Sequence, residues 1–228
     1  MKTMSLLALS LSSLLTGSLA YADDNDADSL EATTGFDHRV PAPSNAIELG
    51  IATGYTQGVG PIGGGMQHVE DVSSAGGTVE LDAMYRINPT FAVGAYGSFS
   101  EYATGDHVAG SDDVFGATAG IQAAAHLRPA RSVDPWVSLG TGWRGLWLSP
   151  ETGKNTSLQG LELARLQVGV DYRISQDVAI APVIGGSLNL FVSQDSPMTT
   201  DYTEITDKKV NFIGFAGLAG RFDLGGKR

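Results

Sequence analysis

Residues 166–188 read LQVGVDYRISQDVAIAPVIGGSL, two alternating runs joined by a short turn at residues 175–177. Successive side chains of a β-strand point to opposite faces, so a period of two predicts a hairpin with one apolar wall and one small or polar wall. The apolar wall consists of Leu166, Val168, Val170, Tyr172 and Ile174 in the first run and Val178, Ile180, Pro182, Ile184 and Leu188 in the second.

The same alternation recurs in six further segments outside this hairpin. They are NAIELGIATGY (45–55), TVELDAMYRI (78–87), TFAVGAYGSFS (90–100), VFGATAGIQAAAHL (114–127), WVSLGTGWRGLWL (136–148) and VNFIGFAGLAGRF (210–222). In the last segment the best register places Phe212, Leu218 and Phe222 on the apolar face. The pattern predicts an all-β protein with eight strands.

Connections between these segments alternate in length. Those at residues 88–89, 128–135 and 175–177 are short, whereas those at 57–77, 101–113, 149–159 and 191–209 are long. Short turns at one end and long loops at the other are typical of an outer-membrane barrel. Strands of about 9–11 tilted residues are long enough to cross a bilayer. We therefore expect an eight-stranded antiparallel up-and-down transmembrane β-barrel.

The charged residues of the strands decide which face is turned outward. If the polar face pointed to lipid, each basic residue at the bilayer midplane would cost about 2–4 kcal/mol. The apolar face must therefore point outward, and the charges must meet inside, where they need partners. The predicted interior ion network is Glu48, Glu80, Asp82, Arg144, Arg165 and Asp171. Arg86 and Arg173 are expected nearer the short-turn rim.

Aromatic residues gather at the predicted strand ends, as in the girdles of membrane barrels. The girdle at the short-turn end is predicted to be Tyr85, Phe91, Tyr172 and Phe222. The girdle at the long-loop end is predicted to be Tyr55, Phe99, Phe115, Trp143, Trp147 and Phe212.

The pattern of DPWVSLGTGWRGL (134–146), of the hairpin quoted above and of the closing AGLAGRFDL (216–224) resembles the small eight-stranded outer-membrane barrels, the class of the OmpA transmembrane domain and OmpX. The resemblance implies an integral membrane protein that assembly machinery inserts into the outer membrane. A barrel of eight strands has an interior that side chains fill.

Composition excludes several other classes of protein. The chain has 228 residues with 30 glycines and no cysteine, so it is neither a disulfide scaffold nor a thiol enzyme. Its net charge of −11 argues against binding to nucleic acid, which requires clustered Lys and Arg.

The N-terminal region has the features of an export signal. Residues 1–22, MKTMSLLALSLSSLLTGSLAYA, carry one basic residue, an apolar run and a small-x-small ending, which predicts a cleaved secretory signal of a Gram-negative cell envelope protein. Residues 23–44 are acidic and without apolar period, so we expect a disordered, solvated tail. The barrel is predicted over 45–224 and a short C-terminal tail over 225–228.

Motifs that could carry chemistry have simpler interpretations. The run from Gly58 to Gly63 matches G-x-G-x-x-G, but no helix follows it, so a flexible loop is expected. A lipid-modifying enzyme would need a serine nucleophile beside His126, and nothing in the sequence sets Ser132 or Ser138 there. His126 stands at the end of a predicted strand and is expected to be a solvated rim residue. We therefore predict no catalytic, cofactor-binding or metal site.

The leading hypothesis is an outer-membrane barrel with a structural or surface-interaction role and no enzymatic activity. Its expected partners are outer-membrane lipid, lipopolysaccharide and, during insertion, the barrel assembly machinery. The main alternative is a secreted, soluble eight-stranded barrel that binds a small apolar ligand, as lipocalins do. Lesser alternatives are a lipid-modifying barrel enzyme and a narrow channel.

Overall fold

The computed structural model describes residues 38–63, 66–105, 113–149, 155–195 and 202–227. The predicted signal, residues 1–22, and most of the predicted tail lie outside the described residues. Eight long strands make up most of the described part: β1 (Ala46–Val59), β4 (Ser73–Arg86), β5 (Phe91–Thr104), β6 (Asp113–His126), β7 (Val133–Ser149), β8 (Thr156–Arg173), β9 (Val178–Asp195) and β11 (Val210–Leu224). Short elements are β2 (Pro61–Gly63), β3 (Met66–His68), α1 (Val69–Val72) and β10 (Thr203–Glu204). Within this described part, no helix has the length and apolar character needed to cross a membrane.

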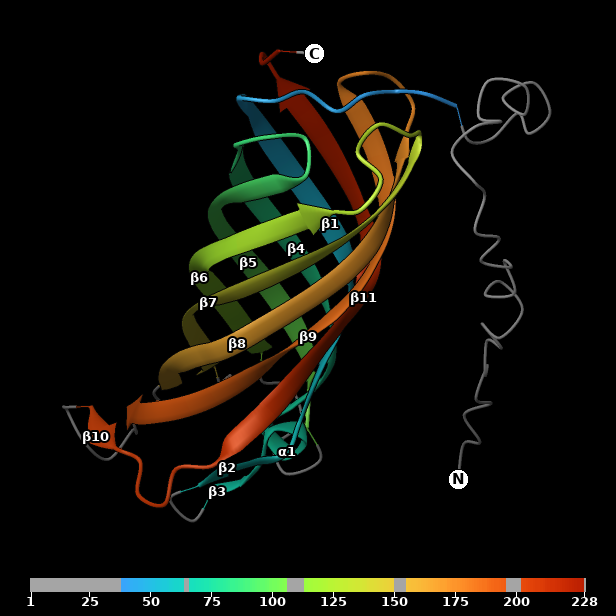
Figure 1. Ribbon diagram of the computed structural model, residues 1–228. Coiled ribbons are helices and arrows are strands. Elements are labelled where there is room, and N and C mark those ends of the chain that lie inside the picture. The colour runs from blue at the N-terminus through green and yellow to red at the C-terminus, as the bar shows by residue number, and fades with distance from the viewer. Residues whose placement is uncertain (1–37, 64–65, 106–112, 150–154, 196–201, 228) are drawn as a thin grey trace, which may run out of the picture. The chain divides into compact units, whose positions relative to one another are not determined.

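The eight long strands close into one antiparallel barrel (Figure 1). Each long strand pairs with its neighbour along the chain, and β1 pairs with both β4 and β11, which joins the two ends of the sheet. In the closing pair Thr53 lies opposite Leu218. This is the predicted eight-stranded up-and-down barrel, and the prediction of the fold is confirmed.

Apolar side chains cover the outer surface of the barrel wall. Leu81 on β4 is 59% exposed and Leu166 on β8 is 49% exposed, whereas Glu80, the neighbour of Leu81, is 7% exposed. The chosen register of the last strand also holds, because Phe212, Leu218 and Phe222 are exposed while Arg221 is buried. The wall therefore has the apolar-out, polar-in arrangement predicted from the alternation.

Two short turns at one end of the barrel are stabilised by hydrogen bonds from backbone N–H groups to a side-chain oxygen of the same turn. Asn88 Oδ1 accepts hydrogen bonds from the N–H groups of Thr90 and Phe91, both at 2.9 Å. Ser175 Oγ accepts from the N–H of Val178 at 3.1 Å in the turn between β8 and β9. Such side-chain caps replace the ladder hydrogen bonds that a strand loses at a tight turn.

The long connections contain more regular structure than the sequence predicts. The predicted loop at 57–77 holds the end of β1, the hairpin of β2 and β3, the helix α1 and the start of β4. The run from Gly58 to Gly63, expected as a flexible loop, is instead the end of β1 followed by β2. Gly60 and Gly63 have φ of 105° and 106°, values that glycine adopts without steric strain.

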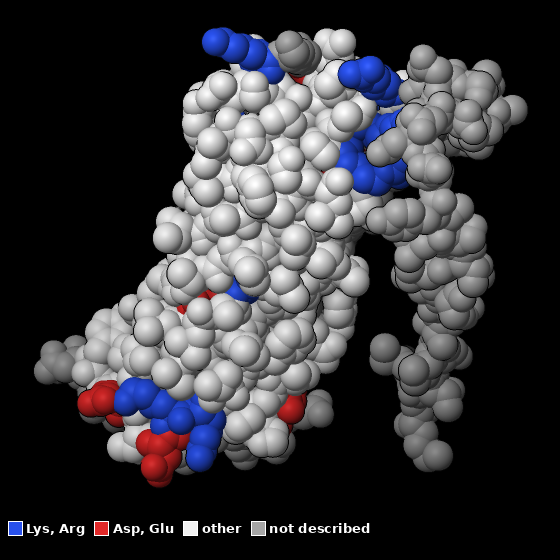
Figure 2. Space-filling view, viewed as in Figure 1, with Lys and Arg blue, Asp and Glu red and all other residues white. Residues whose placement is uncertain are grey.

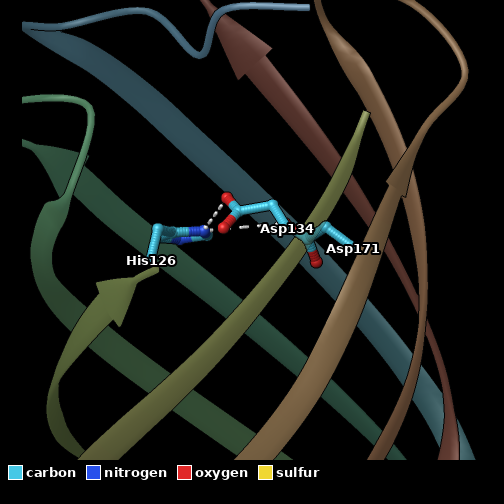
Figure 3. A group of neighbouring side chains, drawn as sticks. All are labelled: His126, Asp134 and Asp171. Atoms are coloured by element: carbon cyan, nitrogen blue, oxygen red, sulfur yellow. Dashed lines mark hydrogen bonds and ion pairs between the residues drawn. The ribbon is translucent and has the colours of Figure 1, made fainter. Parts of the chain in front are cut away.

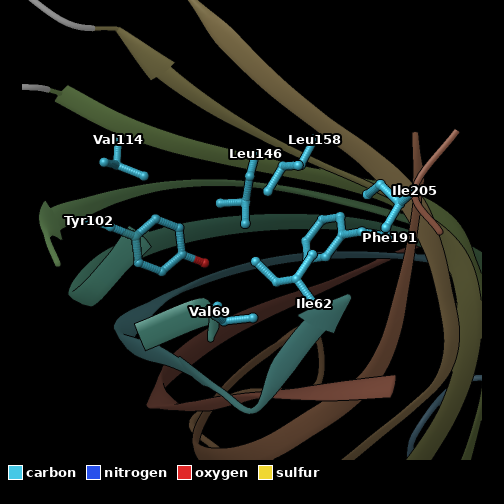
Figure 4. Close-up of a cluster of buried hydrophobic side chains, with 8 residues drawn as sticks. All are labelled: Ile62, Val69, Tyr102, Val114, Leu146, Leu158, Phe191 and Ile205. Carbon is cyan, nitrogen blue, oxygen red and sulfur yellow. The ribbon is translucent and has the colours of Figure 1, made fainter. Parts of the chain in front are cut away.

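A cluster of buried apolar side chains, which we call the apolar plug, fills the barrel at the long-loop end (Figure 4). It consists of Ile62, Val69, Tyr102, Val114, Leu146, Leu158, Phe191 and Ile205. These residues come from β2, from α1, from the segment that follows β10 and from the long-loop ends of five barrel strands. The alternation in the sequence predicts no apolar interior at this end.

The described end of the predicted N-terminal tail is ordered, which corrects the expectation for residues 38–44. The N–H of Val40 donates to the carbonyl of Ala130 at 3.1 Å, and the N–H of Ala42 donates to Pro129 at 2.7 Å. Both side chains are buried. In Figure 1 this segment, which we call the strap, crosses the short-turn end of the barrel. Residue Lys227 of the predicted C-terminal tail pairs with Ser44 in the same region.

Candidate functional site

The inward faces of the strands carry a dense set of charged residues in two groups. The mid-barrel cluster is formed by Glu80, Tyr96, Arg144, Glu162, Arg165 and Gln167. The short-turn cluster is formed by Glu48, Asp82, Arg86, His126, Asp134, Asp171, Arg173, Arg221 and Asp223. All six residues of the predicted ion network lie in these two clusters.

Two ion pairs dominate the mid-barrel cluster. Arg144 Nη2 lies 3.0 Å from Glu162 Oε1, and Arg165 pairs with Glu80. The hydroxyl of Tyr96 donates to Glu162 Oε2 at 2.5 Å, and the guanidinium of Arg165 lies 4.1 Å from the centre of the Tyr96 ring. Each of these four charges in the mid-barrel cluster therefore has an opposite charge and a hydrogen bond, the condition under which ions are tolerated in a protein interior.

A small polar cavity lies beside the mid-barrel cluster. Its volume is about 40 Å³, and hydroxyl groups such as those of Thr78, Ser98 and Ser100 line it together with the ion pairs. A space of this size holds about two or three water molecules. The interior is thus filled by side chains with room for a few small polar molecules.

Arginines bridge carboxylates across the short-turn cluster. Glu48 pairs with Arg86 and, at 3.0 Å from Oε1, with Arg221 Nη1. Arg173 Nη1 lies 2.8 Å from Asp223 Oδ2, and Arg86 Nε lies 3.4 Å from Asp223 Oδ1. These pairs connect β1, β4, β8 and β11 at the end of the barrel where the turns are short.

His126 lies inside this cluster with no solvent exposure, so the prediction of a solvated rim residue is wrong (Figure 3). Its Nδ1 lies 2.8 Å from Asp134 Oδ2 and 3.8 Å from Asp171 Oδ2, and its Nε2 lies 4.0 Å from Glu48 Oε2. The histidine is the last residue of β6 on the inward parity, and the strap covers this end of the barrel. Burial follows from that position.

The two serines considered as nucleophiles have other surroundings. Ser132 Oγ accepts a hydrogen bond from the backbone N–H of His38 at 2.9 Å, which ties the strap to the turn. Ser138 is buried in β7 with Gln167 opposite it. The imidazole of His126 faces carboxylates, so the arrangement is that of an ion network rather than an activated hydroxyl.

Several members of the two clusters are not among the residues predicted from the sequence, for different reasons. Arg221 and Asp223 alternate with Phe222 and could have been assigned to the interior from the chosen register. Glu162 could not, because alternation counted back from Arg165 places it outside. The structure has a register irregularity between Glu162 and Ala164, which returns Glu162 to the interior.

The predicted girdle residues lie on the outer surface, but Tyr55, Phe99 and Trp143 lie four to six residues inside the long-loop ends of β1, β5 and β7. Tyr55, Tyr85, Phe91, Phe99, Tyr172, Phe212 and Phe222 are exposed, and Phe115, Trp143 and Trp147 are partly exposed. Phe99 stacks on Phe115 with ring centres 5.8 Å apart, and the rings of Trp143 and Trp147 are 5.9 Å apart. Aromatic pairs of this kind suit the boundary between hydrocarbon and headgroups.

Comparison with solved structures identifies the fold as that of the small outer-membrane barrels. Neisserial surface protein A superimposes with a TM-score of 0.50 and 15% identity over 79% of this chain and 98% of that protein. OprG from Pseudomonas aeruginosa has a TM-score of 0.48 and 10% identity over 81% of this chain and 99% of OprG. Ail of Yersinia pestis has a TM-score of 0.43 and 15% identity over 78% of this chain and 99% of Ail. The sequence matches no protein-family model and no curated protein.

Proposed function

We propose that this chain is an integral outer-membrane barrel with a structural or surface-interaction role that it performs without catalysis. The observation that carries the proposal is the inversion of polarity across the wall. Apolar side chains such as Leu81, Ile121 and Leu139 are exposed on the outside, while paired charges such as Arg144 and Glu162 are buried inside. This arrangement is stable when hydrocarbon surrounds the barrel.

The distribution of charge over the surface supports the membrane assignment. In Figure 2 the charged side chains gather at the two ends of the barrel, and the surface between them is almost entirely uncharged. A soluble, lipocalin-like barrel would need the reverse, a polar exterior around an apolar lining. The described lining is hydroxyl-rich and ionic along most of its length, which argues against that alternative.

A filled interior favours a structural or surface role over transport. The apolar plug occupies the long-loop end, the two ionic clusters occupy the middle and the short-turn end, and the strap crosses the short-turn end. Contact with other molecules is then left to the outer wall and to the long-loop end. We expect lipid to contact the wall and lipopolysaccharide to border the long-loop end, where Lys209 is exposed.

Heat-modifiable gel migration combined with membrane fractionation tests the proposal. A barrel embedded in the outer membrane is recovered in the envelope fraction that detergent solubilises. Its apparent mass changes on boiling, because the closed sheet stays folded in detergent until the sample is heated. Recovery in the periplasm without detergent, with no shift on boiling, would refute the membrane assignment. Lipid-modifying activity in reconstituted vesicles that disappears in His126→Ala would refute the non-enzymatic part.

A further inference from the structure

Three buried side chains from three neighbouring strands converge at the short-turn end of the barrel (Figure 3). His126 ends β6, Asp134 lies at the start of β7, and Asp171 lies near the end of β8, directly opposite Asp134 in the sheet. One nitrogen or oxygen atom from each lies within 4.8 Å of the others. All three side chains are completely buried.

Asp171 is the member of this group without a hydrogen bond. Neither carboxylate oxygen of Asp171 has a hydrogen-bond partner among the described residues. Arg221 Nε lies 3.5 Å from its Oδ1, and His126 Nδ1 lies 3.8 Å from its Oδ2. A buried carboxylate normally accepts several hydrogen bonds, and leaving one without any costs free energy. Oδ2 therefore lies beside the histidine with no hydrogen bond of its own.

Asp134, in contrast, is held in place for a second partner. Its Oδ1 accepts a hydrogen bond from the backbone N–H of Arg128 at 2.8 Å, which fixes the carboxylate and leaves Oδ2 directed at His126. The far nitrogen of the imidazole, Nε2, lies 4.0 Å from Glu48 Oε2, a carboxylate oxygen on the side where Nε2 would carry its proton. Outer partners that orient ligating side chains in this manner are a regular feature of metal sites.

The ionic interior contains more formal negative charges than positive ones. Its seven described carboxylates stand against five guanidinium groups, a difference of two. The carboxylates are Glu48, Glu80, Asp82, Asp134, Glu162, Asp171 and Asp223, and the guanidinium groups are those of Arg86, Arg144, Arg165, Arg173 and Arg221. The mid-barrel cluster is balanced, so the excess of negative charge lies in the short-turn cluster. One divalent cation there would balance these formal charges.

We propose that His126, Asp134 and Asp171 bind a divalent transition-metal ion of the zinc type through Nδ1 of the histidine and one oxygen of each carboxylate. Two ligand atoms that each lie about 2.0–2.1 Å from a tetrahedral Zn²⁺ are roughly 3.3 Å apart. The observed separations of 2.8 Å and 3.8 Å from Nδ1 bracket that value. An imidazole with two carboxylates suits Zn²⁺, whereas Mg²⁺ and Ca²⁺ prefer oxygen ligands alone.

Such an ion is structural, because it joins β6, β7 and β8 at the end where the short turns lie. The strap and the turn at residues 127–132 cover the group, so the metal is expected to enter while the barrel folds. The competing explanation is an imidazolium that bridges the two carboxylates with no metal. That state supplies one positive charge instead of two.

The test uses the full chain refolded from urea into detergent micelles, with Zn²⁺ present or with a chelator. After removal of free metal, we expect about one Zn²⁺ per folded barrel by elemental analysis, and none after refolding with Mg²⁺ alone. Refolding with Co²⁺ is expected to give the visible absorption of a nitrogen and oxygen ligand set.

Asp171→Asn is the informative variant, because it keeps the shape of the side chain and removes its charge. We expect it to refold with heat-modifiable migration and to bind Zn²⁺ at least tenfold more weakly, whereas Glu204→Gln at the exposed long-loop end leaves binding unchanged. His126→Gln is a second variant with the same expectation. A folded wild-type barrel with less than a tenth of an equivalent of Zn²⁺, or equal binding by folded Asp171→Asn, would overturn the proposal.

Discussion

At the scale of single residues, the interior depends on charges that are stable only in pairs. Arg144 and Glu162 illustrate this, since both are buried and each supplies the opposite charge to the other. Replacing a whole buried pair with apolar residues is often neutral, but removing one partner is strongly destabilising because an uncompensated charge remains. Removing one partner should therefore destabilise the barrel, whereas replacing both with apolar residues should change its stability little.

We predict that Glu162→Gln lowers the free energy of unfolding by about 3–5 kcal/mol, because Arg144 loses its carboxylate in the barrel interior. Urea unfolding in lipid vesicles, followed by tryptophan fluorescence, measures the change. The double variant Arg144→Met with Glu162→Leu is expected to recover most of the loss. A double variant less stable than Glu162→Gln would contradict the account of the pair.

Outward-facing residues offer the complementary prediction. Leu81→Arg places a guanidinium on the outer wall midway along β4 and is expected to cost about 2–4 kcal/mol. Leu224→Arg at the short-turn end of β11 is expected to cost only about 0–1 kcal/mol, because the side chain reaches the headgroups. Equal costs for the two variants would show that hydrocarbon does not surround the wall at Leu81.

At the scale of elements, strand positions were predictable because lipid imposes one simple rule on every spanning strand. Residues such as Leu166 and Val168 must face outward, and alternation then assigns their neighbours. The rule fails where it is interrupted or reversed. The irregularity beside Glu162 interrupts it, since Leu163 and Ala164 are both exposed. A local bulge of this kind leaves no trace in the sequence alone.

The rule reverses at the long-loop ends of the strands. Glu101 is exposed while Tyr102 is buried, and Leu146 and Leu158 point inward. Strands that extend beyond hydrocarbon into water bury their apolar face inside the barrel, as soluble proteins do. The sequence therefore predicts long connections at Tyr102 and Leu158, and the alternation of 136–148 does not indicate that Leu146 joins an apolar plug.

Phe191→Ala tests the plug as an element. Phe191 is completely buried, so its truncation is expected to cost about 3–5 kcal/mol and to loosen the long-loop end. Limited proteolysis should then cut the segment of β2, β3 and α1 faster than in the wild type. The conservative Phe191→Leu is the matched control with near wild-type protection. Unchanged proteolysis of Phe191→Ala would mean that the plug does not hold this segment.

At the scale of the whole molecule, the barrel is a closed wall around a closed interior. The plug, the two ionic clusters and the strap follow one another along its length, and the polar cavity between them is only about 40 Å³. We therefore predict no steady single-channel conductance for the wild-type barrel in planar lipid bilayers. Reproducible openings of uniform size would contradict the filled interior and favour the narrow-channel alternative.

The most direct measurement of the central claim is a cysteine scan of β4. The chain contains no cysteine, so each single variant carries one thiol for a spin label. In lipid vesicles, labels at Val79, Leu81 and Tyr85 are predicted to collide with oxygen dissolved in the hydrocarbon. Labels at the inward positions Thr78 and Met84 are predicted to be shielded from it. Shielding of the odd-numbered positions, with the even-numbered ones exposed to lipid, would contradict the inside-out barrel.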